Sequence, residues 1–343
     1  MKYLIIGGAG FIGSNFSKLL IENGEEVIIC DNLSRKGTTV NLSYFQENYK
    51  GRYQFIYLDI RNDYEKLISI VNNVDVVFHL AAQVAVTTSV YNPKEDFSIN
   101  AFGTFNILEA IRLSNNKPLL IYASTNKVYG EMENIGVVEK DSRYHYTDLE
   151  KGISEKQNLD FHSPYGCSKG TGDQYVIDYS RIYGLKTVVF RQSCIYGPMQ
   201  FGIEDQGWVA WFAIASILNK SIKIYGDGKQ VRDVLSVFDL FELWYLASKN
   251  IDKINGQAFN IGGGHENVIS LLELIEILKE KLNKKIEYQF DEWRPGDQKI
   301  YISDITKIRN LTGWKPKITI YEGLDLLLMW VKSNEKVLKS ILG

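Results

Sequence analysis

The sequence has few of the residues that build disulfide frameworks or zinc sites. It contains 3 cysteines, Cys30, Cys167 and Cys194, and 4 histidines, and neither set is clustered at metal-ligand spacing. An odd and widely scattered cysteine set predicts reduced thiols rather than a disulfide scaffold. We therefore expect no metal site, and we expect the histidines to have structural or surface roles.

Long hydrophobic runs and runs of one charge are also missing. The apolar run near the start of the sequence is too short for a signal sequence, and no later stretch approaches the length of a membrane span. The 39 basic and 41 acidic side chains are interspersed, so neither a basic stripe for nucleic acid nor a polybasic segment for membranes is present. These absences predict a cytoplasmic protein that acts on a small molecule. Neither nucleic acid nor a membrane is an expected partner.

What the sequence does contain begins with a glycine-rich turn. A short apolar run at residues 3–7 precedes Gly7, Gly10 and Gly13, and helical spacing of apolar residues follows over residues 14–24. Glycines in such a strand–turn–helix unit let the backbone approach a pyrophosphate, whose charge the helix amino terminus favours. This stretch predicts a dinucleotide-binding turn.

The next apolar run, residues 26–30, ends in an acidic residue, Asp31. An acid at this distance from the glycine turn is typical of sites that bind the adenosine ribose hydroxyls of NAD. Arg35 and Lys36 weaken this preference, because basic residues after the second strand are what the 2′-phosphate of NADP needs. NAD is the expected cofactor.

Apolar runs at residues 54–58, 74–79, 118–122 and 186–191 alternate with helical stretches. Unbroken apolar strands in a βαβα order predict a parallel sheet that is covered on both faces. The expected fold class is α/β, a Rossmann-like doubly wound parallel sheet with a smaller α/β carboxyl-terminal region that binds substrate. We place the boundary between residues 1–191 and 192–343 and expect the two regions to be interleaved.

Less regular segments separate or follow these strands. Residues 131–159 are polar and charged without clear periodicity, so they are expected to form a long excursion that covers a site. Residues 202–218 predict a helix that carries Trp208 and Trp211, and a second strong helical pattern spans residues 271–282. The two tryptophans either stack on a nucleobase or pack in the core, and core packing is the favoured interpretation.

The stretch at residues 163–184 predicts a helix that carries Tyr165 and Lys169. Four residues are about one helical turn, so both side chains project from the same face. An ammonium beside a phenol favours the phenolate, and we expect it to move the pKa of Tyr165 toward neutrality. This pair is a candidate acid–base unit.

Seven motifs occur in order along almost the whole chain. They are Gly7-x-x-Gly10-x-x-Gly13, Asp59-Ile60, Ala81-Ala82, Ser124-Thr125-Asn126-Lys127-Val128-Tyr129-Gly130, Tyr165-x-x-x-Lys169, Gly226-Asp227-Gly228-x-x-Val231-Arg232-Asp233-Val234 and Arg294-Pro295-Gly296-Asp297. Together they resemble the extended short-chain dehydrogenases/reductases, in the group of nucleotide-sugar epimerases and dehydratases.

The resemblance implies roles for individual residues. It implies catalysis by Thr125 as the hydroxyl partner, Tyr165 as the base and Lys169, which also holds the nicotinamide ribose. The cofactor-binding residues that it implies, besides Tyr165 and Lys169, are Gly7, Gly10, Phe11, Ile12, Gly13, Asp31, Asn32, Asp59, Ile60, Leu80, Ala81, Ala82, Gln83 and Asn100. The implied substrate-binding residues are Thr125, Asn126, Cys194, Gln206, Arg232, Arg294 and Asp297, of which the two arginines and Asp297 hold the nucleotide diphosphate.

The residues after Thr125 separate the reactions of this group. Sugar 4,6-dehydratases place an Asp-Glu pair there, whereas this sequence has Asn126 and Lys127, which cannot replace a carboxylate pair. A finer pattern is carried by residues 124–130, 161–170, 200–212 and 228–235. It is similar to epimerases that interconvert CDP-paratose and CDP-tyvelose, two CDP-linked 3,6-dideoxyhexoses that differ at C2. That similarity implies a transient 2-keto sugar with bound NADH, and a role in lipopolysaccharide O-antigen biosynthesis. One departure is Met199, where the pattern predicts an arginine before Gln200.

Other interpretations stay open at this point. The scaffold also permits a C4 epimerase of a UDP-hexose, or a catalytically silent protein that binds NAD. Cys194 stands where related C4 epimerases have an asparagine, so it either lines the sugar pocket or is a buried spectator thiol. Members of the group commonly form homo-oligomers, so a dimer or tetramer is expected.

Overall fold

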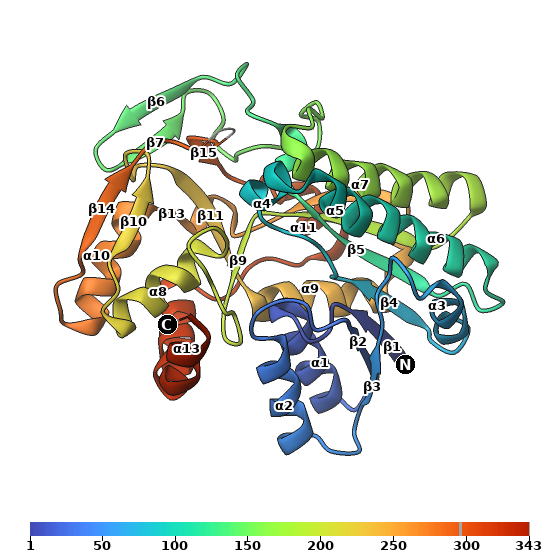
Figure 1. The fold of residues 1–343 in the computed structure, drawn as a ribbon. Helices are drawn as coiled ribbons and strands as arrows, with labels where there is room; N and C mark the ends of the chain where they lie inside the picture. The colour runs from blue at the N-terminus through green and yellow to red at the C-terminus, as the bar shows by residue number, and fades with distance from the viewer. Residues whose placement is uncertain (295–296, 343) are drawn as a thin grey trace. The chain divides into compact units, whose positions relative to one another are not determined.

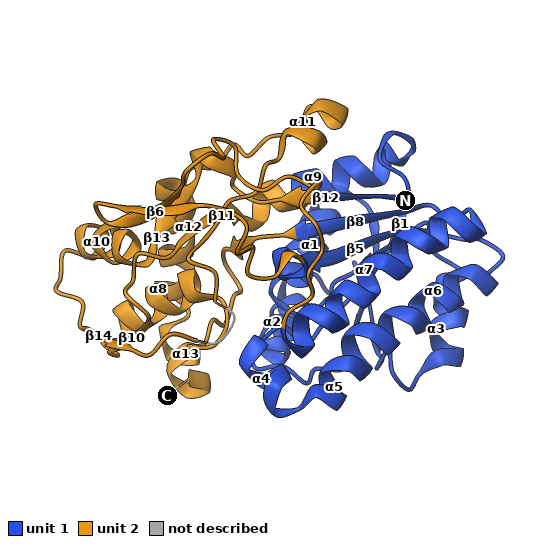
Figure 2. Ribbon diagram, turned by 90° about the horizontal axis from the view of Figure 1, so that it is seen from above, with its two compact units in different colours: residues 1–128, 163–191, 241–259 blue, residues 129–162, 192–240, 260–343 orange. Residues whose placement is uncertain are grey.

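The structure, a computed structural model, describes residues 1–294 and 297–342. The chain forms two compact units, each built from three separate segments (Figure 2). The first unit contains residues 1–128, 163–191 and 241–259, and the second contains residues 129–162, 192–240 and 260–343. Residues 129–162 therefore belong to the second unit although they precede residue 191, and residues 241–259 belong to the first.

A seven-stranded parallel sheet forms the centre of the first unit, in the order β12-β8-β5-β4-β1-β2-β3. Its strands are β1 (Lys2–Ile6), β2 (Glu26–Asp31), β3 (Gln54–Tyr57), β4 (Val76–His79), β5 (Leu119–Thr125), β8 (Thr187–Gln192) and β12 (Gln257–Ile261). Strand β1 lies between β2 and β4, with Ile6 opposite Cys30 on one side and His79 on the other. This order confirms the predicted doubly wound α/β fold.

Helices cover both faces of this sheet, because successive strand residues point to opposite sides. The helices of the first unit are α1 (Phe11–Glu22), α2 (Thr38–Asn48), α3 (Tyr64–Val71), α4 (Val86–Tyr91), α5 (Pro93–Phe97), α6 (Gly103–Leu113), α7 (Ser163–Tyr183) and most of α9 (Val237–Lys249), with a π-helical turn η1 (Ser98–Phe102) and a 3₁₀ turn η3 (Ile251–Lys253). Figure 1 shows α6 and α7 on one side of the sheet and α1 and α2 on the other.

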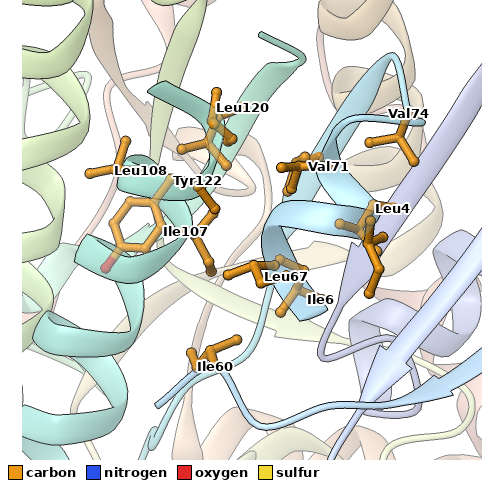
Figure 3. Packing of buried hydrophobic residues seen from close by; sticks show 14 of the residues in the cluster. Leu4, Ile6, Ile60, Leu67, Val71, Val74, Ile107, Leu108, Leu120 and Tyr122 are labelled. Atoms are coloured by element: carbon orange, nitrogen blue, oxygen red, sulfur yellow. The ribbon is translucent and has the colours of Figure 1, made fainter. Parts of the chain in front are cut away.

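The alternation along β1 divides the core into two layers. Leu4 and Ile6 pack in a cluster with α3, α6 and α7, part of which is drawn in Figure 3. Tyr3 contacts the other layer through Phe78, which packs edge-on against the fully buried Trp244 of α9. Burial of each such large side chain contributes roughly 1.5–3 kcal/mol to the stability of the folded chain. The two layers together therefore hold the strands, and with them their carboxyl ends, in place.

The described part of the second unit contains three small sheets. Its strands are β6 (Val137–Lys140), β7 (Arg143–Tyr146), β9 (Cys194–Tyr196), β10 (Ile222–Tyr225), β11 (Val231–Ser236), β13 (Val268–Ser270), β14 (Tyr288–Asp291) and β15 (Ile300–Tyr301). Strand β11 is central, because β9, β13 and β15 all pair with it, while β10 pairs with β14 and β6 with β7.

Helices of the second unit pack around an apolar core of their own. They are α8 (Trp208–Leu218), α10 (Leu271–Leu282), α11 (Thr306–Thr312), α12 (Ile320–Ser333) and α13 (Glu335–Leu342), with a 3₁₀ turn η4 (Gly264–Glu266) after β12. The 3₁₀ turn η2 (Asn126–Tyr129) belongs to the first unit except for its last residue. A capping box starts α10, in which the Ser270 side chain accepts from the Glu273 amide and Glu273 accepts from the Ser270 amide. The predicted helix at residues 271–282 is confirmed.

Two local predictions are wrong. The helix predicted over residues 202–218 begins only at Trp208, because Gly207 precedes it with a φ of 77° and residues 202–206 form a turn. The excursion at residues 131–159, which showed no clear periodicity and was expected to be a long loop, contains the hairpin of β6 and β7. A bidentate contact of Arg143 with Glu273 of α10 anchors this hairpin, and that partner lies 130 residues away in sequence.

Candidate active site

The glycine-rich turn joins β1 to α1 and has no room for side chains. Gly7 has a φ of 81°, and a Cβ atom there would lie 2.6 Å from the Ala81 backbone nitrogen. A Cβ on Gly13 would lie 2.6 Å from the Gly8 Cα, so the first turn of α1 packs directly on the loop. Phe11 and Ile12 open the helix, and its N-cap residue, Gly10, offers no side chain to the free amides. The turn is therefore shaped to present backbone amides to an anion.

Asp31 ends β2 beside this turn and is 9% exposed. Its carboxylate accepts hydrogen bonds from the Ala9 amide at 3.0 Å and the Leu33 amide at 2.8 Å. Burial raises the pKa of Asp31, and the two amides and the charge of Arg35 oppose that rise. A buried carboxylate held in this way is suited to accept hydrogen bonds from two ribose hydroxyls.

Asn32, Asp59 and Ile60 form the neighbouring part of the rim. Asp59 receives two hydrogen bonds from the Arg61 guanidinium, at 2.9 and 2.7 Å, and one from the Asn32 amide at 3.0 Å. The Arg61 bonds are the main reason that the pKa of Asp59 falls to about 2. Ile60 is buried and packs against Gly103 of α6. The Asp59 carboxylate thus orients Asn32 and stays ionised at neutral pH.

The loop after β4 brings Leu80, Ala81, Ala82 and Gln83 to the same edge of the sheet. Asn100, in the π-helical turn η1, holds this loop with two hydrogen bonds to the Gln83 backbone, both 3.0 Å long. All of the residues expected to bind the cofactor therefore lie in the first unit. Most of them stand at or near the carboxyl ends of its strands, where ligands of doubly wound sheets bind.

Thr125, Tyr165 and Lys169 meet at this edge as well. Thr125 ends β5, while Tyr165 and Lys169 lie one turn apart on α7, and all three are at least nine-tenths buried. Thr125 acts on the Tyr165 phenol and lowers its pKa, against the larger effect of burial. The Lys169 ammonium donates to the Ala123 carbonyl at 2.6 Å and lies 4.2 Å from the centre of the Tyr122 ring. The structure thus brings together the three predicted catalytic residues.

The predicted direction of the Tyr165 shift is wrong for this structure. Burial raises the pKa of Tyr165 to about 12, and the Thr125 hydrogen bond and the charge of Arg35 only partly oppose it. Burial also lowers the pKa of Lys169 to about 7, against the attraction of Asp173 and Asp96. Desolvation is the largest cause of both shifts, and Lys169 is not among the groups that lower the pKa of Tyr165, because its ammonium is directed at the Ala123 carbonyl.

Asn126 and Lys127 follow Thr125 in the 3₁₀ turn η2. The Asn126 side chain is 9% exposed and its oxygen accepts from the Thr125 hydroxyl at 3.4 Å. The Lys127 amide donates to the Thr125 oxygen at 3.2 Å. Both residues therefore position the threonine, and neither supplies a carboxylate for elimination.

The predicted diphosphate residues lie in the second unit. Arg232 on β11 is 8% exposed and donates to Asp297 at 2.8 Å, so the two form a largely buried pair. Arg294 donates to Asp205 at 2.9 Å and its guanidinium lies 3.8 Å from the centre of the Tyr225 ring. Each of these charged groups thus has a partner within the chain, and diphosphate binding remains a prediction.

The remaining predicted substrate residues of this unit are Cys194 and Gln206. The Trp208 indole donates to the Cys194 sulfur at 3.3 Å, and Trp208 and Trp211 both pack against the apolar core, in line with the favoured interpretation of these tryptophans. The backbone of Gln206 forms a tight turn through two 3.0 Å bonds with Ile203. Met199, at the position where an arginine was expected, is 8% exposed.

Sequence reasoning missed two buried carboxylates near Lys169. Asp173 follows Lys169 by one turn of α7 and forms a bidentate pair with Arg191, and it also accepts from Ser124 at 2.7 Å. Asp96 on α5 is 1% exposed and accepts from Ser168. The four-residue spacing from Lys169 to Asp173 was a usable signal. Nothing local in the sequence links Asp96 to the lysine.

Metal ligands and membrane helices are absent from the part of the chain that the structure describes. In residues 1–294 and 297–342, no group of three or more histidine, cysteine, aspartate or glutamate side chains could hold a metal ion. Within the same residues, no helix has both the length and the apolar character needed to cross a membrane.

Known proteins resemble this chain over nearly its full length. The family described as GDP-mannose 4,6 dehydratase matches residues 4–327. CDP-paratose 2-epimerase of Salmonella typhi is 46% identical over 340 residues, which cover 97% of this chain and 100% of the relative. A putative UDP-glucose 4-epimerase of Methanocaldococcus jannaschii is 36% identical, with coverage of 97% and 99%.

A solved structure also resembles this chain over nearly its full length. UDP-glucuronic acid 4-epimerase from Bacillus cereus, in complex with UDP-glucuronic acid and NAD, aligns with a TM-score of 0.83 and 28% identity and covers 97% of this chain and 99% of that chain. The cradle of glycines and the Thr125, Tyr165 and Lys169 set agree with these likenesses. The chain therefore belongs to the GDP-mannose 4,6-dehydratase family of extended short-chain dehydrogenases/reductases.

Proposed function

We propose that this enzyme epimerises a CDP-linked 3,6-dideoxyhexose at C2 and interconverts CDP-paratose and CDP-tyvelose. Nucleotide-sugar epimerase activity is the coarser assignment, and it follows from relatives named as epimerases that match along the whole chain. The observation that carries the finer proposal is the 46% identity to CDP-paratose 2-epimerase over the full length of that relative. Asn126 and Lys127 beside Thr125 support epimerisation rather than dehydration.

NAD is the cofactor, and the first unit fits it. The closed packing at Gly7 and Gly13 leaves backbone amides for the pyrophosphate, and Asp31 offers a held carboxylate for the ribose hydroxyls. Bound NAD supplies a nicotinamide ring that accepts a hydride from a sugar carbon and returns it. Because no net reduction occurs, we propose that the enzyme retains its NAD through the cycle.

The residues of the first unit handle the proton. In the proposed reaction, the Tyr165 phenolic oxygen takes the proton of the C2 hydroxyl and later returns it. Thr125 donates a hydrogen bond to the reacting oxygen and stabilises its charge. With a pKa of about 12, a value that already includes the charge of Arg35, Tyr165 would be ionised at pH 7 in only about one molecule in 10⁵. A further cation is therefore needed, and Lys169 is the one we assign to that task.

The residues of the second unit bind substrate in this proposal. Arg232 and Arg294 are the groups we assign to the diphosphate, since planar guanidinium forks match phosphate oxygens. Asp297 and Asp205, their present partners, hold the two arginines extended and charged until phosphate replaces them. Cys194 and Gln206 stay candidates for the sugar, together with Asn126 of the first unit.

We also propose that copies of this chain associate through the helices of the first unit. Several large side chains on these helices are exposed, among them Tyr91 (89%), Phe97 (57%), Phe102 (45%) and Tyr175 (45%). Phe105 of α6 stacks on Phe102 and packs edge-on against Tyr175 of α7, so these three exposed rings are in contact across the two helices. An apolar surface of this kind supports a homo-oligomer.

The test of the proposed function is proton NMR of the purified protein with CDP-paratose, CDP-tyvelose, UDP-glucose or UDP-glucuronate in separate tubes, without added NAD. Inversion at C2 of the CDP sugars alone is expected. Inversion at C4 of a UDP sugar would instead assign the chain to the C4 epimerases, and no change in any tube would contradict both assignments.

A further inference from the structure

Two buried carboxylates lie close to Lys169, and they differ in what neutralises them. Asp173 is paired with the Arg191 guanidinium through bonds of 2.9 and 2.8 Å, so its charge is compensated locally. Asp96 receives its hydrogen bonds from two neutral groups, the Ser168 hydroxyl at 2.5 Å and the Asn100 amide at 3.2 Å. Burial raises the pKa of Asp96, while the Ser168 hydrogen bond and the charge of Lys169 oppose that rise and favour the ionised form, which accepts hydrogen bonds and donates none.

The hydrogen bonds of Asp96 connect it to the proposed proton-handling machinery. Ser168, its donor, directly precedes Lys169 on α7, and the Ser168 hydroxyl also lies 3.2 Å from the Tyr165 carbonyl. Asn100 donates to Ser168 at 3.1 Å and holds the Gln83 backbone of the cofactor rim. Asp96 thus sits at the junction of the catalytic helix and the rim loop, although α5 supplies no group to the reaction itself.

We propose that Asp96 is a positioning residue whose buried negative charge sets the ionisation of the Tyr165 and Lys169 pair. This inference rests on the proposed role of those two residues in proton transfer. The carboxylate stabilises the Lys169 ammonium, which burial would otherwise discharge, and it opposes formation of the Tyr165 phenolate. Asp96 therefore sets the pH range in which Tyr165 and Lys169 are in their active protonation states, and it takes no part in the chemistry itself.

Asp173 also raises the pKa of Lys169, and more than Asp96 does, but of the two carboxylates only Asp96 acts on both Lys169 and Tyr165. His79 on β4 is buried, and burial together with the Lys169 charge holds its pKa well below the usual range, so it is neutral. Burial raises the pKa of Tyr122 on β5 well above its usual value, so this phenol is neutral too. The titratable and charged groups that face the pair are Asp96 from α5, Asp173 from α7, His79 from β4, Tyr122 from β5 and Arg35 from the loop after β2.

The charge is removed most conservatively by Asp96→Asn, and Asp96→Ser offers a smaller neutral side chain. Both changes should lower the pKa of Lys169 and of Tyr165, because a negative charge stabilises the protonated form of each. The pH profile of kcat/KM for the sugar that the enzyme turns over should then move to lower pH on both limbs, by on the order of one pH unit. The matched control is Ser168→Ala, which removes one hydrogen bond of Asp96 and leaves the bond from the Asn100 amide. Asp96 should stay ionised at neutral pH in this variant, so its profile should move much less than that of Asp96→Asn.

A readout that needs no sugar separates this inference from the proposed function. The ultraviolet difference spectrum between each protein and its Tyr165→Phe counterpart reports the titration of this one phenol. A downward shift of that titration in Asp96→Asn, with a much smaller one in Ser168→Ala, would support the role of Asp96 even if no nucleotide sugar reacts.

Unchanged titration and unchanged pH limbs in folded Asp96→Asn and Asp96→Ser would overturn the inference. An equal shift in Ser168→Ala would also overturn it, since the effect would then follow the hydrogen bond and not the charge. If both Asp96 variants fail to fold, the residue is structural and the inference is wrong.

Discussion

The buried pair of Asp173 and Arg191 gives the sharpest test of how the first unit is held together. Both side chains are almost completely buried, at 0% and 5% exposure, and they join α7 to β8. Replacing Asp173 by asparagine keeps the shape but leaves the Arg191 charge without its counter-ion. Breaking such a pair from one side costs about 3–5 kcal/mol, because the remaining charge stays buried.

The matched control lies on the same helix. Asp178 and Arg181 form an exposed ion pair at 3.3 Å, with side-chain exposures of 52% and 70%. Its loss through Asp178→Asn should cost no more than about 1 kcal/mol. In thermal unfolding monitored by circular dichroism, Asp173→Asn should lower Tm by roughly 6–20 °C, given about 2–4 °C per kcal/mol for a unit of this size, whereas the control should hardly move it.

A double variant tests the physical reason for the loss. Asp173→Asn combined with Arg191→Gln removes the uncompensated charge, so the two single losses should not add and the double variant should recover part of the stability. Strictly additive losses would show that packing, and not charge, causes the effect. A Tm for Asp173→Asn that equals that of Asp178→Asn would refute the reasoning altogether.

Three further outcomes are expected. Tyr165→Phe should keep its NAD, measured in the supernatant after denaturation, but lower turnover by roughly two or more orders of magnitude; near-normal turnover would remove this residue from the base role. Lys169→Met should unfold at a higher temperature than the wild type near pH 7. The pKa of Lys169 is about 7 in the folded chain and about 10.4 in the unfolded chain, so keeping this buried group charged lowers the stability of the wild type. That advantage should shrink as the pH rises from 7 toward about 10.4, because unfolding takes up a proton at this group over that range and the wild type gains stability with pH. An advantage that does not vary with pH would contradict the assignment. Gly13→Ala should lose most of its bound NAD, because the added Cβ would lie 2.6 Å from the Gly8 backbone and displace the turn; full NAD content in the purified variant would show that the turn can absorb the change.

Short spacings in the sequence determined much of this protein. The glycine turn followed by Asp31 predicted the cofactor edge, the four-residue step from Tyr165 to Lys169 placed both on one helix face, and Asn126 with Lys127 argued against a dehydratase. Such features are readable because covalent spacing and helical or strand periodicity fix which neighbouring groups meet.

The tertiary structure alone decided the electrostatics. The sequence argument predicted a lowered pKa for Tyr165, but burial raises it, and burial is a property of the packed layers and not of the helix. Asp96 reaches Ser168 across 72 residues, and Arg232 reaches Asp297 across 65. Pairings over such distances in sequence depend on how separate segments pack. The local sequence pattern could therefore predict which groups react, but it could not predict their surroundings or their protonation states.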